Sequence, residues 1–422
     1  MPIDLARKEP RAGHRPEPAT LHARNHTAQN SGYDRLALLN SGPGSAQPLV
    51  DGLLSIAVRG LPRMYNGDMF AHTLRSIDTR GAGTERLEGV SIRYTAMTAL
   101  GMAHLDSQTQ MRILGGSTVT ELLDRAAAMA QQSRDAGSAA LVAWATAEVS
   151  GVFAAPLFQA LAARFQAGTP ISTVECAWTL SAALAAAHLG DTSQLRTAAR
   201  SRLLSARAGS PLFGHMIPTS ASGLLRSHIG CFADQVYPIQ ALARLHVATG
   251  DTEALAAAEA CARCICELQG SSGQWWWHYD IRNGSVAEGY PVYSVHQHAM
   301  APMALLELRE AGGPDLMKPL VSGLLWLEDH PEAPDALIVP NKGVVWRKIA
   351  RREPNKLVRK MAAASSALLP GMRLPGLDVL FPATRIDREC RPYEFGLMLY
   401  AWLSGGTVAS LAGHGGAGGA KS

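Results

Sequence analysis

The chain has 422 residues, a formal charge of +4 and a mean hydropathy of +0.01. So small a positive charge, without a nucleic-acid-binding motif, argues against a nucleic-acid partner. The most apolar stretch, residues 139–163, contains Glu148 and Pro156, so it predicts buried helices rather than a membrane span. Residues 1–18 have no apolar core typical of a signal peptide, which favours a cytoplasmic protein.

Six cysteines are spread along the chain. Disulfides are not expected in the cytoplasm. Cys261 and Cys264 have the spacing of half a zinc site, but the chain offers no second cysteine pair at a suitable distance. The sequence therefore predicts no metal site and no cofactor.

Composition divides the chain into three parts. Residues 1–47 are rich in Pro, Ser, Asn, His and Arg and lack apolar periodicity, which predicts a disordered leader. Residues 48–405 carry apolar residues at helical spacing and predict one helical domain. Residues 406–422 are expected to form a flexible tail rich in Gly and Ala.

Pairs of predicted helices recur along the helical domain. In the clearest pair, a glycine ends the first helix and an aspartate stands at the start of the second, as helix capping requires. In chain order, the pairs are 92–105 with 118–131, 139–151 with 157–166, 175–189 with 194–205, 237–250 with 253–268, and 295–311 with 315–327.

A sixth pair forms if residues 393–403 pack beside residues 49–58 from the other end of the domain. Six pairs predict an all-α fold, an (α/α)6-type toroid of about six helical hairpins, because a closed ring buries the apolar face of every repeat. The insertions at 206–232, 270–293 and 329–390 are then loops at the mouth of the ring, where chemistry is usually placed. An open α-solenoid used as a binding surface is the alternative.

The most informative stretch is Gly273–Asp280 with Tyr290–His298, which holds three of the eight Trp and three of the nine Tyr. Three adjacent Trp cannot all enter one core, because neighbouring side chains point in different directions. We expect some of them to line a concavity, where aromatic faces stack on a ligand and polar groups fix its orientation. A hairpin that plugs one end of the ring is the alternative. The predicted substrate-binding residues of this stretch are Trp275, Trp276, Trp277, His278, Tyr290 and Gln297.

Candidate acid and base groups lie near the predicted starts of inner helices. A His and Tyr pair with a nearby carboxylate suits proton transfer near neutral pH. Two carboxylates that face each other across ~5–10 Å would make a glycosidase. Asp234 and Glu394 lie in similar aromatic or proline-containing sequences. A single structural role that occurs twice in the fold would also explain this similarity. The predicted catalytic residues are His296, Tyr293, Asp280, Glu394 and Asp234.

A basic segment, residues 346–360, carries seven cations and one acid. Arginine binds phosphate and carboxylate groups through two parallel hydrogen bonds, so this segment predicts a site for an anionic group. Arg351 in this segment, with Arg93 and Arg391 near hairpin starts, is predicted to bind the anion. A solvated charged face is the alternative.

Gln269–Trp275 resembles the QW motif of terpenoid-cyclase and prenyltransferase toroids. This resemblance implies a ring of helical hairpins. Class II cyclases protonate an alkene through a D-x-D-D acid and class I enzymes bind Mg²⁺ through D-D-x-x-D, but this sequence contains neither. The toroid architecture is therefore retained, and terpene chemistry is kept only as an alternative.

Residues 50–405 also resemble VpsJ-like proteins, which are found with bacterial exopolysaccharide synthesis genes. The residues that carry this resemblance are Phe232–Pro238, Gln274–Asp280, Tyr290–Met300 and Arg391–Glu394. The resemblance implies a role in polysaccharide assembly, and it implies no particular catalytic residue.

Together, these features predict a carbohydrate-active protein of bacterial polysaccharide biosynthesis. It would act by acid/base chemistry on an anionic or lipid-diphosphate-linked sugar, as a hydrolase, lyase or epimerase, and other polysaccharide-assembly proteins would be its partners. A terpenoid-cyclase-like enzyme and a non-catalytic scaffold that binds a glycan or a protein are the alternatives. A deep apolar tunnel would favour the cyclase, and a filled ring would favour the scaffold.

Overall fold

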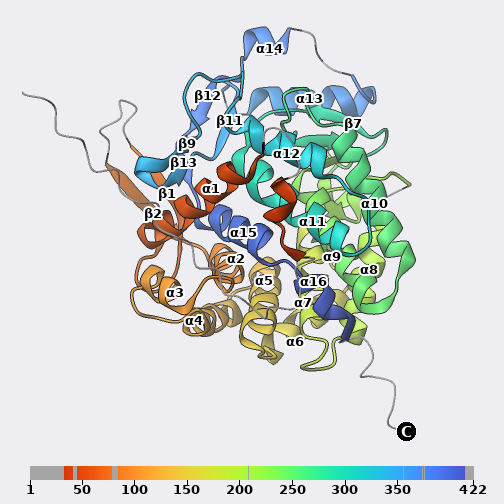
Figure 1. Ribbon diagram of the computed structural model, residues 1–422. Helices are drawn as coiled ribbons and strands as arrows, with labels where there is room; N and C mark the ends of the chain where they lie inside the picture. Colours follow the sequence, from red (N-terminus) through yellow and green to blue (C-terminus); the bar gives the residue numbers. More distant parts are fainter. Residues whose placement is uncertain are drawn as a thin grey trace, which may run out of the picture.

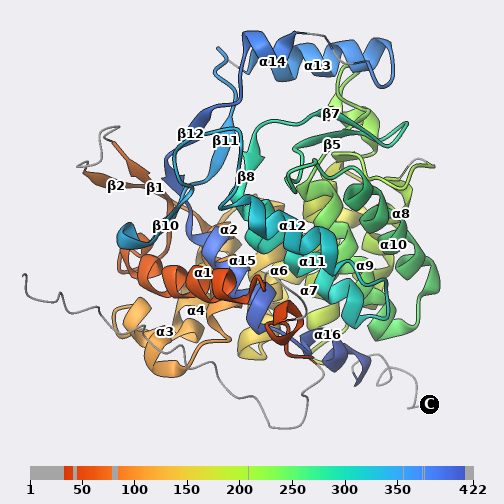
Figure 2. The same ribbon diagram turned by 45° about the horizontal axis from the view of Figure 1, so that its top comes forward.

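The computed structural model describes residues 33–40, 45–77, 84–207, 209–354, 356–372, 374 and 376–413. Its helices form a closed ring of two layers, with small β-sheets gathered at one end (Figures 1 and 2). None of the helices in these ranges is long and apolar enough to cross a membrane. All six cysteines are free.

Six helices of the described chain form the inner layer, and each packs against the next around the ring. The last inner helix along the chain packs against the first and closes the circle. The inner helices are α2 (Ile92–Met102), α5 (Ala136–Ala145), α7 (Thr173–Ala185), α9 (Ala233–Thr249), α11 (Ala301–Glu310) with its preceding π-helical turn η6 (His296–Met300), and α15 (Pro392–Leu403).

Outer helices cover this layer, one for each inner helix. They are α1 (Gln47–Gly60), α4 (Val119–Gln132), α6 (Ala155–Gln166), α8 (Ser193–Ser205), α10 (Thr252–Glu267) and α12 (Met317–Trp326). The prediction of an (α/α)6 toroid is confirmed, and so is the predicted contact between the two ends of the domain, because α1 packs beside α15 (Figures 1 and 2).

Local sequence explains why these helices form where they do. The inner helices α5, α7 and α15 are buried on nearly every side, and their sequences are apolar all round, as a helix enclosed by others requires. Two of the outer helices, α4 and α10, begin at side-chain caps. Asp251 accepts a hydrogen bond from the backbone N–H of Ala254, and Thr118 forms a capping box with Glu121.

The insertions contain strands that the sequence does not predict. Figure 2 shows most of them on one side of the ring, together with α13 (Leu357–Leu368) and α14 (Leu377–Leu380). The sheets, in strand order, are β13 (Glu389–Cys390), β1 (Ala71–Ser76) and β2 (Glu85–Val90); β5 (Ile229–Cys231), β6 (His278–Asp280) and β7 (Ser285–Glu288); β12 (Arg385–Asp387), β11 (Lys348–Ala350) and β8 (Val292–Tyr293); β3 (Ile171–Ser172) and β4 (Met216–Ile217); and β10 (Val344–Val345) and β9 (Ile338–Val339). All pair antiparallel.

Parts of the expected leader and tail pack onto the ring. Arg35 is 2% exposed and donates hydrogen bonds to Glu310, to the carbonyl of Ala401 and to Ser404. At the other end of the chain, η8 (Leu411–Gly413) follows α16 (Thr407–Ser410) and packs on α9. Residues 1–32 and 414–422, which hold most of the expected leader and tail, lie outside the described residues.

Candidate active site

The first turns of the inner helices contact one another at a common mouth. Arg93 at the start of α2 donates hydrogen bonds to Asp135, the N-cap of α5, and to Glu175 in the first turn of α7. The Arg93 guanidinium lies 5.5 Å from the ring centroid of Trp178, whose ring contacts Tyr237 of α9 edge-on. Three inner helices are thus joined through Arg93, and α9 is joined to them through Trp178.

Aromatic rings complete this circuit. The ring centroid of Phe232, just before α9, lies 4.4 Å from that of His296 at the start of η6. Tyr94 of α2 lies at the same centroid distance from Tyr393 of α15. All six inner helices therefore direct the positive end of their dipoles to this mouth, where an anion is stabilised.

Glu394, in the first turn of α15, is a buried carboxyl group at the mouth. Its side chain is 1% exposed, and neither oxygen has a hydrogen-bond partner among the described residues. The Nε atom of Arg347 lies 3.6 Å from Oε1. Burial raises the pKa of Glu394 to about 7, against the opposing charges of Arg347 and Arg391. The group therefore exchanges its proton in the neutral range, as a general acid requires.

An ion-pair cluster surrounds Glu394. Glu389 accepts hydrogen bonds from Arg391 at 2.9 Å and from Arg347 at 3.4 Å. Although burial opposes it, the hydrogen bond from Arg391 and the charges of Arg391 and Arg347 lower the pKa of Glu389 to about 2. Arg391 also donates to the hydroxyl of Tyr94. Arg391, predicted as an anion-binding residue, lies in this cluster, whose carboxylate Glu389 stays ionised at neutral pH.

A second acid/base pair lies at the start of α9. Asp234 is fully buried, accepts a hydrogen bond from the backbone N–H of Cys231, and lies 3.1 Å from Nδ1 of His215. His215 is 48% exposed, and its hydrogen bond with Asp234 raises its pKa. When Asp234 accepts a hydrogen bond from Nδ1–H, Nε2 is the atom of His215 that takes up or releases a proton. The contact with Asp234 thus fixes the orientation of the His215 ring.

The same place offers metal ligands. Ligand atoms of His215, Cys231 and Asp234 lie within 4.8 Å of one another, and these three residue types bind zinc in proteins. The hydrogen bonds of Asp234 to His215 and to the Cys231 backbone account for its buried charge without an ion. We therefore interpret His215 and Asp234 as an acid/base pair. The activity of a Cys231→Ala variant distinguishes this pair from a metal site.

The three Trp of the aromatic stretch have different surroundings. Trp275 is fully buried against Phe232 in the core. Trp276 is half-buried and meets the ring of Tyr290 edge-on. Trp277 is half-buried, with ring centroids 4.7 Å from Tyr293 and 5.7 Å from His296. Of the three, Trp277 is the one that the structure brings to the predicted residues Tyr293 and His296.

The histidines of this stretch stay neutral. Burial lowers the pKa of His296 to about 3, and it lowers that of His278 well below its usual value. Burial also raises the pKa of Tyr293. This corrects the expectation that His296 and Tyr293 exchange protons near neutral pH, because a buried ring or hydroxyl without a counter-charge keeps its neutral form.

Other predicted residues have structural partners. Asp280 is fully buried and accepts hydrogen bonds from the Arg282 guanidinium through both oxygens. Arg351 is paired with Glu288 and Asp378, so its guanidinium already has carboxylate partners and is not free to bind an anionic ligand. Gln297 donates to the carbonyl of Tyr293 and accepts from the backbone of Trp275. Tyr290 donates its hydroxyl to Glu332 and lies beside the Arg351 guanidinium. These contacts correct the expectation of a substrate-facing role for Asp280 and Arg351.

Sequence reasoning missed several residues of the mouth: His215, Tyr94, Glu175 and Glu389. His215 lies just before β4, which pairs with β3 at the start of α7 and so carries this insertion back to the mouth. Its sequence signal is weak, since a single His in a long insertion resembles many surface residues. Tyr94 and Glu175 lie in the first turns of predicted inner helices and could have been found there.

A scan against protein-family models gives no match, and a search of curated proteins finds no significant similarity in sequence. Solved structures are similar in fold. An unsaturated glucuronyl hydrolase specific for heparin is 13% identical, with a TM-score of 0.54, over 86% of this chain and 96% of that one. An unsaturated glucuronyl hydrolase of Bacillus sp. GL1, responsible for glycosaminoglycan degradation, is 15% identical, with a TM-score of 0.52, over 85% and 96% of the two chains. At these identities the likeness shows the shared toroid fold.

Proposed function

We propose that this protein is an enzyme that cleaves an anionic saccharide by acid/base chemistry at the mouth formed by the N-terminal ends of its inner helices. The observation that carries the proposal is Glu394, a buried carboxyl group without a hydrogen-bond partner among the described residues, whose pKa is about 7. A pKa this close to the working pH is what proton donation to a glycosidic oxygen requires.

Glu394 is the proton donor in this proposal. At neutral pH a large fraction of the group holds its proton, which it can give to the leaving oxygen. The Arg347 guanidinium, 3.6 Å away, then stabilises the carboxylate that remains. Burial thus favours the protonated form of Glu394 before the reaction, and Arg347 stabilises the carboxylate form after it.

His215 and Asp234 are the proton acceptor in this proposal. Asp234 holds Nδ1 of His215, so Nε2 can take a proton from an attacking water. The exposure of the ring lets a water molecule reach it. Of the three predicted reaction types, we favour hydrolysis, because it uses such a donor and acceptor and because the similar folds belong to glucuronyl hydrolases.

The charges at the mouth suit an anionic sugar. The cluster beside Glu394 has four cations and two carboxylates, which leaves two positive charges while Glu394 is protonated; its members are Arg75, Arg86, Arg347, Arg391, Glu88 and Glu389. The N-terminal ends of the inner helices add positive potential. A uronate meets both demands, since its carboxylate binds arginine while its ring stacks on Trp277 or Tyr293.

The finer assignment, to bacterial exopolysaccharide assembly, is supported by the sequence resemblance to VpsJ-like proteins. The substrate class of the similar structures, which are unsaturated glucuronyl hydrolases, supports an anionic sugar over a lipid diphosphate. The charged mouth disfavours the cyclase alternative, because a hydrocarbon substrate needs apolar walls.

Turnover of uronate-ended oligosaccharides tests the proposal. We expect cleavage of the acid and much slower cleavage of its methyl ester, which lacks the charge. Glu394→Gln and His215→Ala should each lower kcat by roughly 10²–10⁴-fold without a loss of folded protein. Asp124→Asn on the exposed side of α4 is the matched control and should retain full activity. An unchanged kcat in Glu394→Gln, or equal cleavage of acid and ester, refutes the proposal.

Two further variants separate roles within the mouth. Trp277→Ala should raise KM, whereas Trp275→Ala should lower stability by roughly 3–5 kcal/mol, because it removes a buried core ring. Cys231→Ala should retain activity, and Zn²⁺ or a chelator should not change it, if His215 and Asp234 act as an acid/base pair. Two results together would show a metal site instead. Cys231→Ala would lose activity, and the native protein would lose activity to a chelator and regain it when Zn²⁺ is added.

A further inference from the structure

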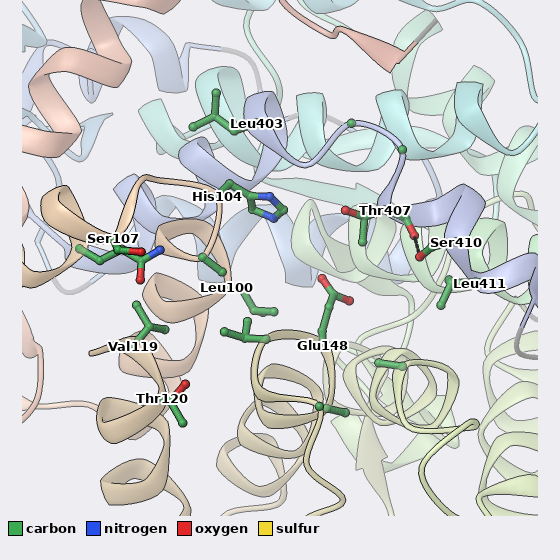
Figure 3. Close-up of a pocket in the computed structure, with 18 of the residues that line it drawn as sticks. Leu100, His104, Ser107, Val119, Thr120, Glu148, Leu403, Thr407, Ser410 and Leu411 are labelled. Atoms are coloured by element: carbon green, nitrogen blue, oxygen red, sulfur yellow. Dashed lines mark hydrogen bonds between the residues drawn. The ribbon is translucent and has the colours of Figure 1, made fainter. Parts of the chain in front are cut away.

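A large cavity lies at the opposite end of the ring from the acid/base mouth. Its volume is about 1070 Å³, which is at the upper limit of the ~300–1,000 Å³ typical of small-molecule pockets. The last residues of α2, α5 with the following turn, α7 and α15 reach it, including Leu100, Glu148 and Leu403 (Figure 3). Residues 33–34 and 405–411 form another part of its wall.

The wall of the cavity is polar but holds no lysine or arginine among the described residues. Hydroxyl, amide and apolar side chains line it together, with the carboxyl groups of Asp34 and Glu148 and the imidazoles of His104 and His188. The hydroxyl and amide side chains of the wall belong to Ser107, Gln110, Thr118, Thr120, Thr407 and Ser410. Such a wall suits a ligand with several hydroxyl groups and does not suit an anion.

Glu148 brings a carboxylate to this wall, and the cation that it pairs with, Arg244, also pairs with Glu307. Arg244 forms two hydrogen bonds with Glu307 and a third, of 2.8 Å, with Glu148, so one buried cation serves two carboxylates. Although burial opposes it, the charge of Arg244 and its hydrogen bond lower the pKa of Glu148. Glu148 is therefore ionised, and among the described residues one cation, Arg244, pairs with both Glu148 and Glu307.

Glu148 also retains a free acceptor position. A carboxylate has about four acceptor positions. Oε2 accepts hydrogen bonds from Trp144 and Arg244, and Oε1 accepts one from Tyr400. The side chain is 14% exposed, and Figure 3 shows it directed into the cavity. A donor in the cavity can reach Oε1.

Helix dipoles act in the same direction. Four inner helices end at this cavity, so the negative ends of their dipoles point to it, and a cation is stabilised there. The same helices direct their positive ends to the acid/base mouth. One ring of parallel helices thus gives its two ends opposite preferences for charge.

We propose that this cavity is a second ligand site, which binds a protonated amine that also carries hydroxyl groups, the chemistry of an amino sugar. The ammonium group lies at Glu148 and the hydroxyls contact the Ser and Thr side chains of the wall. The proposal does not depend on the reaction at the other end of the ring.

Calorimetry with three matched monosaccharides tests this site. Glucosamine, protonated at the pH of the experiment, should bind; glucose should bind at least ten times more weakly, and glucuronate should not bind. Thr120→Trp fills the cavity from an exposed position and should abolish glucosamine binding. Ala128→Trp, exposed on the same helix α4 and outside the cavity wall, is the control and should bind as the native protein does.

Several outcomes overturn the proposal. Absence of glucosamine binding does so directly, and equal binding of glucose and glucosamine removes the role of charge. Glucosamine binding that survives in Thr120→Trp places the amine elsewhere. Glu148→Gln should weaken binding at least tenfold, and its melting curve shows whether it folds; the Thr120→Trp result stands even if it does not.

Discussion

A carboxyl group buried without a hydrogen-bond partner makes stability depend on pH. Glu394 has a pKa of about 7 in the folded protein and 4.5 as its ordinary value. Below pH 4.5 both states hold the proton. As pH rises from 4.5 to 7, the unfolded chain loses its proton first, so the folded state becomes less stable by roughly 3 kcal/mol, and the loss is complete above pH 7.

Glu394→Gln removes this dependence, because the amide does not titrate. Relative to the native protein, the variant should gain roughly 3 kcal/mol in free energy of unfolding between pH 4.5 and pH 8. Urea denaturation at both pH values measures this difference. Asp124→Asn, the exposed control, should show no comparable shift. A constant difference between Glu394→Gln and the native protein would mean that Glu394 is ionised throughout.

For individual residues, the sequence predicted their positions in the fold better than it predicted the side chains that they contact. It placed Glu394 and Asp234 at inner-helix starts, because helix boundaries follow from local periodicity and capping. It did not show that Arg347 reaches Glu394 or that His215 reaches Asp234. Both partners lie in insertions whose return to the mouth depends on pairing with distant strands.

Among the elements, the helices were predictable and the strands were not. Two outer helices begin with local capping chemistry, Asp251 before α10 and the Thr118 and Glu121 box of α4. The strands are two to six residues long and gain their hydrogen bonds from segments far away in sequence, as β1 does from β13. Alternation over so few residues gives no usable signal.

The basic segment 346–360 shows the same limit of local sequence. Its charges predict an anion site, yet they are matched by acids from other segments. Arg351 is 8% exposed and pairs with Glu288, itself 5% exposed. Arg352, the next residue, is exposed. Sequence order alone does not distinguish these two neighbours.

Arg351→Gln should therefore destabilise the protein by roughly 3 kcal/mol, because removal of one partner leaves the Glu288 carboxylate buried without its cation. Arg352→Gln, the matched control, should change stability by less than ~0.5 kcal/mol. Thermal and urea denaturation of the two single variants measure the contrast. Equal, small effects would mean that Arg351 is available to an anionic ligand after all.

At the scale of the whole molecule, the ring closes where α2 meets α15, the first and last inner helices along the chain. Gly101 of α2 faces Gly396 of α15, and a Cβ atom on either would collide with the backbone of the other helix. The sequence predicted that residues 393–403 close the ring by packing beside residues 49–58, and it predicted no direct contact with α2. It did not predict that closure depends on two glycines, because nothing local links them.

Gly101→Ala and Gly396→Ala should each lower the free energy of unfolding by roughly 1–3 kcal/mol, because a closely packed backbone cannot make room for the methyl group. Helix propensity alone predicts the opposite sign, a gain of about 0.5–1 kcal/mol. Gly52→Ala in α1 is the matched control: no atom lies within 4 Å of its Cβ position, so only the gain should be seen. Urea denaturation of the three variants decides between packing and propensity. If Gly396→Ala is stabilised as Gly52→Ala is, α2 and α15 can separate at little cost, and the ring is held closed instead by contacts such as those of Arg35 with Glu310 and Ser404.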